Sequence, residues 1–95
     1  MYKVVVLESA LKHGLTEEQI LQAWDHAIER TVCFQRDDGS LDYKAIGFDA
    51  NGKAIELGVR VKGTRIAIFH ANAKLTVRMF RELGMERRRD ERHRQ

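Results

Sequence analysis

The sequence predicts an α+β domain built from two N-terminal helices, a four-stranded antiparallel meander and a C-terminal helix. Apolar residues recur at helical spacing over 17–30 and alternate with polar residues over 55–62. Short turn-forming segments separate the runs of strand-forming residues between 31 and 70. Helices gathered at both ends of an antiparallel sheet predict a two-layer domain around one hydrophobic core.

The two N-terminal helices are predicted from the residues that begin and end them. The first is a short helix from Glu8 to His13, closed by Gly14. The second, over about 17–30, follows Thr16 and Gln19, which have the spacing of a capping box. In that motif the threonine hydroxyl accepts from the backbone N–H three residues later, and the glutamine side chain reaches back.

The middle of the chain is predicted to be β-structure because it combines β-branched and aromatic residues with turn signals. Asn51-Gly52 is typical of a tight hairpin turn, since both residues tolerate positive φ. Val4 to Leu7 forms a further apolar run that could be an extra strand. We expect the four strands of the meander at 31–35, 42–48, 55–62 and 65–70, and the last helix at 73–83.

Length and composition fit one domain over residues 1–85, followed by a charged tail over 86–95 that we expect to be disordered. The chain has 95 residues with 43% hydrophobic content, which suffices for one core. Apolar runs such as Val4 to Leu7 are far too short to cross a membrane. The lone Cys33, expected as a buried thiol, cannot form an internal disulfide. We therefore expect a cytoplasmic protein without a membrane segment.

Charge is distributed unevenly along the chain. Residues 1–52 hold 5 Lys+Arg against 9 Asp+Glu, or −4, whereas residues 53–95 hold 12 against 5, or +7. The tail holds 5 Arg against 3 acids, so +5 of that surplus lies between residues 53 and 85. A basic half inside the predicted fold favours a polyanionic partner such as nucleic acid.

The basic residues of the last two strands fall on one predicted face. Alternation places Arg60, Lys62 and Arg65 opposite the apolar residues, together with Phe69. Cations beside an aromatic ring suit the phosphates and bases of nucleic acid. The alternative is that these charges, and the basic stripe of the last helix, only solvate an outer surface. The candidate RNA-binding residues are Arg60, Lys62, Phe69, Lys74 and Arg78.

Two histidines are candidates for proton transfer near neutral pH. His70 ends the last predicted strand, where alternation directs it toward the core with Ile68 unless a bulge turns it outward. His13 precedes Gly14 at the end of the first helix, where a capping role is the alternative.

Other chemistry lacks support in the sequence. No phosphate-binding glycine loop and no Cys/His cluster with zinc spacing occurs, and Asp37, Asp38 and Asp42 suit turns better than a cation site. We therefore expect no metal and no cofactor. RNA cleavage by the ribose 2′-OH remains, because it needs only a base, an acid and cations. The candidate catalytic residues are His70, His13 and Arg65.

Three segments carry a resemblance to a known family. They are Ser9 to Ile20 with its Lys-His-Gly-Leu-Thr run, Ala45 to Leu57 with its Ile-Gly-Phe-Asp hairpin, and Ile66 to Ala71 with its His-Ala end. In this order they resemble BrnT-type toxins of type II toxin–antitoxin systems, most closely the actinobacterial members. The resemblance implies a RelE-like fold, metal-independent endoribonuclease activity and a cognate antitoxin. It points to His13, Arg60, Lys62, Arg65 and His70.

One departure from the family concerns the segment after the last strand, where the family usually has an arginine and this chain has Asn72. Either Lys74 or Arg78 replaces that charge, or the nuclease activity is lost. The leading hypothesis is an endoribonuclease toxin that binds RNA and an antitoxin, as a homodimer or a toxin–antitoxin heterotetramer. The alternatives are a non-catalytic nucleic-acid-binding module and a module that binds only a protein partner.

Overall fold

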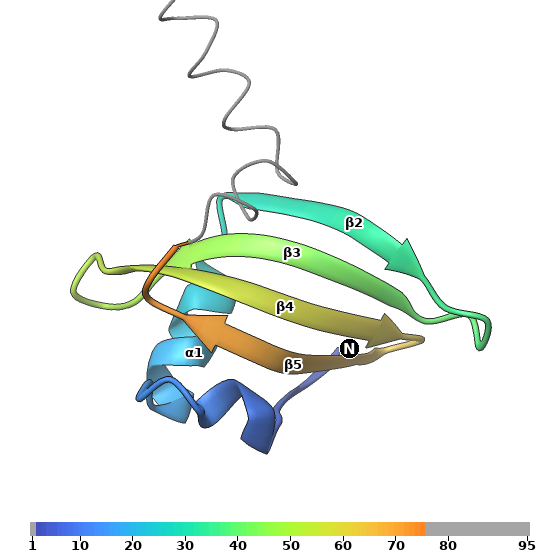
Figure 1. Ribbon diagram of the computed structural model, residues 1–95, viewed down its shortest axis with the longest axis horizontal. Helices are drawn as coiled ribbons and strands as arrows, with labels where there is room; N and C mark the ends of the chain where they lie inside the picture. Colours follow the sequence, from blue (N-terminus) through green and yellow to red (C-terminus); the bar gives the residue numbers. More distant parts are fainter. Residues whose placement is uncertain (1, 76–95) are drawn as a thin grey trace, which may run out of the picture.

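The computed structural model describes residues 2–75, apart from the side chain of Glu29, and contains one five-stranded sheet with a helix against one face (Figure 1). The strand order is β1-β5-β4-β3-β2; β1 runs parallel to β5, and the other neighbours are antiparallel. The elements are β1 (Lys3–Val6), the 3₁₀ turn η1 (Glu8–Leu11), α1 (Glu17–Asp25), β2 (Glu29–Gln35), β3 (Leu41–Phe48), β4 (Ala54–Lys62) and β5 (Arg65–Asn72).

The predicted RelE/BrnT-like arrangement of two N-terminal helices, four strands and a C-terminal helix is wrong. Residues 2–75 form an α+β domain with one α-helix and a mixed sheet of five strands. The segment 8–11 is a 3₁₀ turn of four residues, because the stretch between the end of β1 at Val6 and Gly14 is too short to stabilise an α-helix. Residues 73–75 are not helical. The rest of the predicted helix 73–83 and the tail 86–95 lie outside the described residues.

Strand β1 is the element that most changes the predicted sheet. Its valines pair in parallel with β5, with Val4 opposite Ile66 and Val6 opposite Ile68. Without β1 this edge of β5 would leave its backbone groups unpaired, so a short apolar strand at the start of the chain completes the sheet there.

The helix α1 ends five residues earlier than predicted, at Asp25. The backbone N–H of Ile28 donates to the carbonyl of Ile46 (2.9 Å), and Glu29 then begins the edge strand β2. The apolar pattern continued to residue 30, but pairing with β3 takes these last residues out of the helix. Tertiary pairing thus overrides local helix propensity here.

The predicted capping box at the start of α1 is confirmed. The Thr16 hydroxyl accepts from the Gln19 N–H (3.1 Å), and the Gln19 side-chain oxygen accepts from the Thr16 N–H (2.9 Å). The Gln19 amide also donates to Asp49 (3.2 Å), which fixes the helix to the turn between β3 and β4. Within residues 2–75, no helix is long and apolar enough to cross a membrane.

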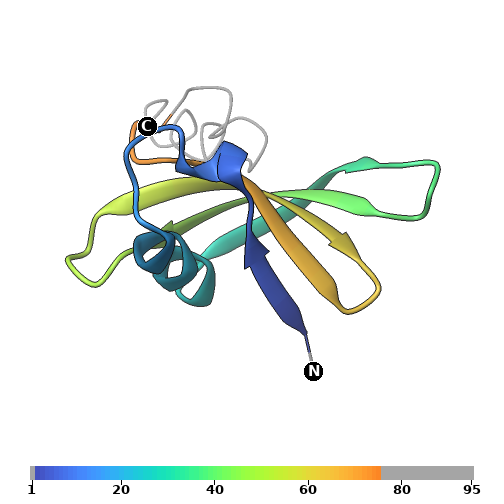
Figure 2. The same cartoon turned by 90° about the horizontal axis from the view of Figure 1, so that it is seen from below.

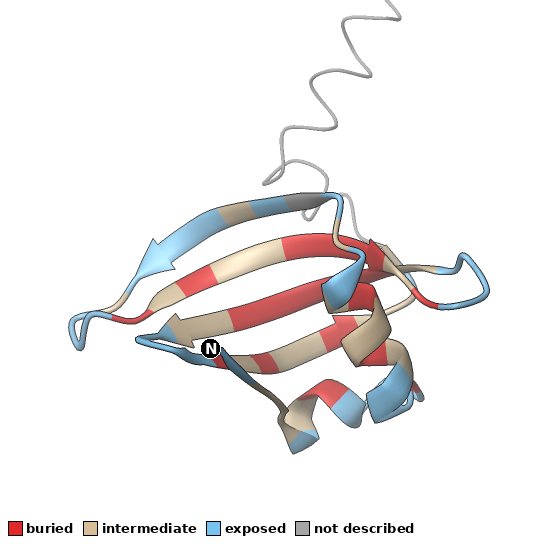
Figure 3. Ribbon diagram, turned by 180° about the vertical axis from the view of Figure 1, so that it is seen from behind, coloured by how far each residue is buried: buried red, intermediate tan, exposed pale blue. Residues whose placement is uncertain are grey.

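The sheet has two faces of different character, which we call the α1 face and the outer face (Figure 2). Along β4, Ile55, Leu57 and Val59 point to the α1 face and are fully buried. Together with Ile20 and Ala23 of the helix they form the centre of the core, and the buried stretches of the sheet lie behind α1 (Figure 3). The alternate residues of β4, Glu56, Gly58, Arg60 and Lys62, belong to the outer face.

Gly47 on β3 is where the helix and the sheet approach most closely. A Cβ atom at this position would overlap the backbone carbonyl of Ala23 in α1. Only glycine therefore allows α1 to pack this closely on the sheet, and the clash involves backbone that cannot rotate away.

We predict that Gly47→Ala destabilises the protein by about 1–3 kcal/mol, because the added methyl forces α1 away from the sheet. Urea unfolding followed by circular dichroism measures this change. Gly39→Ala is the matched control: its Cβ would meet no atom within 4 Å, so only its φ of +88° opposes the substitution. A Gly47→Ala variant as stable as the wild type would contradict this packing.

Candidate functional site

A β-bulge at Phe69 decides which way His70 points. Gly58 pairs with His70 and Val59 pairs with Ile68, so Phe69 is the extra residue on β5. The bulge reverses the alternation: Ile68 and Ala71 are both buried in the core, and His70 lies on the outer face. The sequence therefore placed His70 correctly only under its bulge alternative.

Gly58 provides the space that this bulge requires. A Cβ atom at Gly58 would lie 2.8 Å from Cε2 of Phe69 and 3.1 Å from Cβ of His70. The Phe69 ring therefore rests over the glycine, on the same face as His70. A glycine in the middle of a strand thus marks a close approach of side chains from the neighbouring strand.

A buried carboxylate holds the ring of His70. Nε2 of His70 lies 2.8 Å from Oε2 of Glu56, whose side chain is only 5% exposed, against 34% for His70. Because a carboxylate only accepts hydrogen bonds, Nε2 must carry the hydrogen. Nδ1 is then the ring nitrogen available for chemistry. Glu56 was not among the residues predicted from the sequence, although its place between Ile55 and Leu57 already assigned it to the outer face.

The second candidate catalytic residue, His13, lies beside His70. Their ring centroids are 5.5 Å apart at an interplanar angle of 75°. The segment that carries His13 is held at the end of β5, because the Ser9 hydroxyl donates to the carbonyl of Phe69 (2.7 Å). The two histidines, 57 positions apart by their residue numbers (70 − 13), therefore form one pair, in which His13 is exposed and His70 is half-buried.

Arg65 and Lys62 lie opposite each other at the start of β5 and the end of β4. The parallel pairing of β1 places Lys3 opposite Arg65 on its other side. All three residues are exposed, and together they form a row across three strands of the outer face. Lys3 was not among the residues predicted from the sequence, because no local pattern revealed which strand β1 would join.

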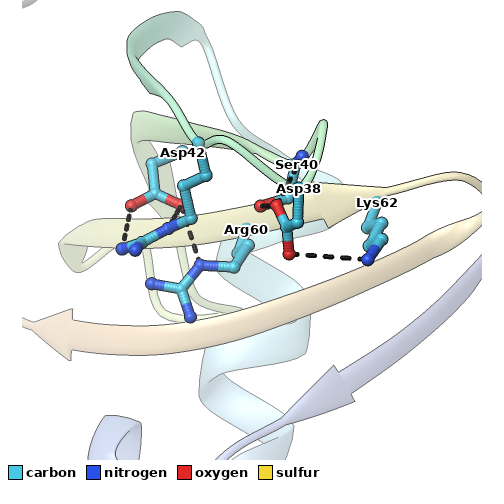
Figure 4. A network of polar contacts seen from close by, with 6 residues as sticks. Asp38, Ser40, Asp42, Arg60 and Lys62 are labelled. Carbon is cyan, nitrogen blue, oxygen red and sulfur yellow. Dashed lines mark hydrogen bonds and ion pairs between the residues drawn. The ribbon is translucent and has the colours of Figure 1, made fainter.

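Arg60 lies on the outer face beside Phe69, as predicted, with its guanidinium carbon 5.0 Å from the ring centroid. Its Nε also donates to Oδ1 of Asp42 (2.9 Å), as Figure 4 shows. Arg36 donates to the same carboxylate from the other side, with Nη2 2.9 Å from Oδ2. Asp42 therefore neutralises part of the positive charge that the sequence assigned to this face.

Two of the three aspartates that the sequence assigned to turns, Asp38 and Asp42, form hydrogen bonds and ion pairs within the protein. Burial alone would raise the pKa of Asp42, but the hydrogen bonds and charges of Arg36 and Arg60 outweigh it and lower that pKa. The hydroxyl and N–H of Ser40 lower the pKa of Asp38 to about 2. Asp38 also accepts from Lys62 (3.4 Å; Figure 4). Among residues 2–75, no group of three His, Cys, Asp or Glu side chains is arranged to hold a metal ion.

The remaining predicted residues lie elsewhere. Lys74 is exposed just after β5, where its backbone N–H donates to the Asn72 side chain (2.9 Å). Arg78 lies outside the described residues. Cys33, expected in the core, is exposed instead, because it occupies a register shift in the edge strand β2.

An open groove on the α1 face contains none of the predicted catalytic or binding residues. Its volume is about 380 Å³. Arg30 closes one side, with its guanidinium 4.2 Å from the Trp24 ring centroid and Nη2 2.7 Å from the Trp24 carbonyl. The lining residues are Tyr2, Val4, Trp24, Arg30, Tyr43, Val61 and Ile66. The candidate site is thus confined to the outer face.

Comparisons of this chain with protein-family models, with curated proteins and with solved structures found no match.

We predict that the protein loses stability in acid as Asp42 and Asp38 become protonated. Both pKa values are lowered in the folded state. Their contributions are therefore complete above the unfolded pKa of about 3.9 and are lost as the pH falls toward the folded values. Urea unfolding at a series of pH values from about 7 down to about 2 should show this decline.

The variant Asp42→Asn should lose less stability between neutral and acidic pH than the wild type, because one of the two carboxylates no longer titrates. It should also lower stability at neutral pH by about 1–2 kcal/mol, since two arginines lose a charged acceptor. Asp37→Asn, at an exposed position in the turn that precedes β3, is the control for the change of charge. An acid decline of the same size in Asp42→Asn and in the wild type would exclude this role.

Proposed function

We propose that the protein is a metal-independent endoribonuclease and the toxin of a type II toxin–antitoxin pair. The observation that carries the proposal is the pairing of His13 with His70 on a sheet face that also presents Arg65 and Lys62. Two imidazoles within 5.5 Å can serve as the base and the acid that RNA cleavage requires. The resemblance of three sequence segments to BrnT-type toxins supports the same reaction independently.

The reaction needs two proton transfers around one phosphate. One imidazole removes the proton of the ribose 2′-OH, whose oxygen attacks the adjacent phosphorus. The bond from phosphorus to the 5′ oxygen then breaks, and the second imidazole donates the proton that the leaving oxygen takes up. The products are a 2′,3′-cyclic phosphate and a free 5′-OH, so atoms and charges balance.

Each remaining residue of the site has a role in this scheme. Glu56 fixes the hydrogen on Nε2 of His70, so that Nδ1 exchanges the proton with the substrate. The row of Lys3, Arg65 and Lys62 lies at the start of β5, about 16 Å along the strand from His70, and holds phosphates of the RNA away from the cleaved bond. Arg60 is held by Asp42 and contributes its remaining N–H groups.

The biological setting follows from the resemblance. A cytoplasmic toxin that cuts RNA requires a cognate antitoxin, and we propose that this chain binds one, as a homodimer or in a toxin–antitoxin heterotetramer. The basic surplus of +7 in residues 53–95 suits both RNA and an acidic protein partner. A small neighbouring reading frame whose product rescues growth would identify that antitoxin.

We predict that His70→Ala lowers the rate of RNA cleavage by about 10²–10⁴-fold, the usual contribution of a general acid or base. Cleavage of a labelled RNA by the purified protein measures the rate, and inhibition of growth on expression gives a second readout. His26→Ala is the control: His26 is an exposed histidine that caps the C-terminal end of α1, away from the outer face. If His70→Ala and Arg65→Ala both kept full cleavage and growth inhibition, the assignment would be wrong.

We further predict that Arg65→Gln lowers the salt dependence of RNA binding. Each phosphate neutralised on a single strand contributes about 0.7 to the slope of log K against log salt concentration. Arg65→Gln should therefore reduce that slope by about 0.7, measured by fluorescence anisotropy. Lys53→Gln, at the far end of β4 in the β3–β4 turn, should leave the slope unchanged. An equal reduction of the slope in Arg65→Gln and Lys53→Gln would mean that Arg65 adds only to the overall charge and contacts no particular phosphate.

The same measurements separate catalysis from binding. Salt-sensitive RNA binding by a protein that never cuts RNA, even at high concentration, would favour the non-catalytic module. Binding to an acidic partner protein without any affinity for RNA would favour the protein-binding module.

A further inference from the structure

Besides the half-buried Phe69, the outer face carries an exposed phenylalanine that the proposed reaction does not use. Phe34 lies on the edge strand β2 and is 56% exposed. The register shift at Cys33 turns Phe34 to the outer face, opposite Asp42, whereas Val32 is opposite Tyr43, which packs against the core on the α1 face. The bulge in β2 therefore moves an aromatic ring away from the core and into solvent.

Each of the two outer phenylalanines has an arginine over its ring. The guanidinium carbon of Arg36 lies 5.5 Å from the ring centroid of Phe34, and that of Arg60 lies 5.0 Å from Phe69. Both distances are within the range of a cation–π contact. Two similar arginine–phenylalanine pairs thus lie at β2 and at β5, on either side of β3.

One carboxylate fixes both pairs. Arg36 donates to Asp42 through Nη2 (2.9 Å) and Nε (3.3 Å), and Arg60 donates to it through Nε (2.9 Å). Asp42 is only 7% exposed, so it is itself held firmly in β3. The two guanidinium planes are therefore pre-oriented, and less side-chain freedom is lost when a ligand binds them.

We propose that the Phe34–Arg36 and Phe69–Arg60 pairs, bridged by Asp42, form a stacking platform for the unpaired bases of single-stranded RNA. This inference rests on the proposed function, because it assigns the outer face to an RNA strand. Because a guanidinium already lies over each ring, the arginine plane offers the outer surface on which a base stacks, and the phenylalanine ring supports that plane. A duplex keeps its bases stacked inside and offers none to such a platform.

The geometry gives the RNA strand a path. The two pairs lie on strands that are three spacings apart, or about 14 Å. A stacked strand rises about 3.4 Å per nucleotide, so the platform engages bases that are not neighbours. Phe69 immediately precedes His70 in β5. A strand that crosses the platform from β2 to β5 therefore reaches the histidine pair directly.

The closing experiment measures binding of a short fluorescent 2′-O-methyl oligouridylate, which cannot be cleaved through a 2′-OH. Phe34→Ala should weaken binding by about 5- to 150-fold, the loss of one base stack, and Phe34→Trp should retain it. The matched control is Val32→Ala, an exposed apolar residue of the same strand on the opposite face, which should leave the affinity unchanged. The same sequence as a duplex should bind more weakly than the single strand.

For the variant Asp42→Asn, the platform and a purely electrostatic role of the two arginines predict opposite changes in RNA affinity. If Arg36 and Arg60 acted only as charges, removal of a neighbouring negative charge would increase the affinity. The platform predicts that the affinity falls, because the guanidinium groups are no longer held over the rings. Circular dichroism checks that each variant is folded. The Phe34 variants change an exposed side chain, so they should leave the packing of the core intact.

The outcomes distinguish this proposal from the proposed function. Weaker oligonucleotide binding by Phe34→Ala in a protein that never cleaves RNA supports the platform and rejects the nuclease. Normal affinity of Phe34→Ala in an active nuclease rejects the platform alone. A change of oligomeric state in Phe34→Ala, seen by sedimentation with unchanged oligonucleotide affinity, also rejects it, since Phe34 would then be a protein contact.

Discussion

The register shift between β4 and β5 is the constraint on which the candidate site depends. Without the extra residue at Phe69, strict alternation would direct His70 into the core with Ile68. With it, Ala71 fills the core position and His70 contacts Glu56 on the outer face. One extra residue in one strand therefore moves His70 from the core to a half-buried position on the outer face, where its ring can contact a ligand. Bulges are found next to active sites for this reason.

The positive charge that the outer face offers to a ligand depends on which cations form ion pairs, and not only on the number of basic residues. The second half of the chain carries +7, but Arg60 and Lys62 each contact an aspartate from the acidic first half. The contact of Lys62 with Asp38 is solvent-exposed and stabilises little. The contact of Arg60 with Asp42 is better shielded and orients the arginine. Arg65 has no ion pair among residues 2–75 and contributes its full charge.

Local signals predicted local structure well. The capping box at Thr16 and the four strands between Thr31 and His70 depend on residues close together in sequence, and the structure contains them. The parallel pairing of β1, the early end of α1 and the exposed Cys33 depend on partners far along the chain. Hydrophobic periodicity over 17–30 could not reveal that Ile28 pairs with β3, because a helix and a short buried strand share such apolar runs.

The same limit applies to the candidate site. His13, His70 and Arg65 were predicted as candidates because their residue types suit proton transfer and phosphate binding. Glu56, Asp42 and Lys3 were missed, because each matters only through a cross-strand neighbour. The position of such a neighbour follows from register, and a shift of one residue moves every side chain to the other face. The local sign of the bulge in the sequence was Gly58, a glycine in the middle of a predicted strand.

In the two edge strands, the same residues discourage pairing with another chain and contribute to the outer face. An open edge invites pairing with another chain, and bulges or charged residues discourage it. β1 has Lys3 at its start, and β2 has a bulge at Cys33 with Arg36 just beyond its end. The bulge that interrupts the edge of β2 is also what turns Phe34 outward, and Lys3 extends the row begun by Arg65. The features that make each edge a poor template for a further strand thus place cations and an aromatic ring on the outer face.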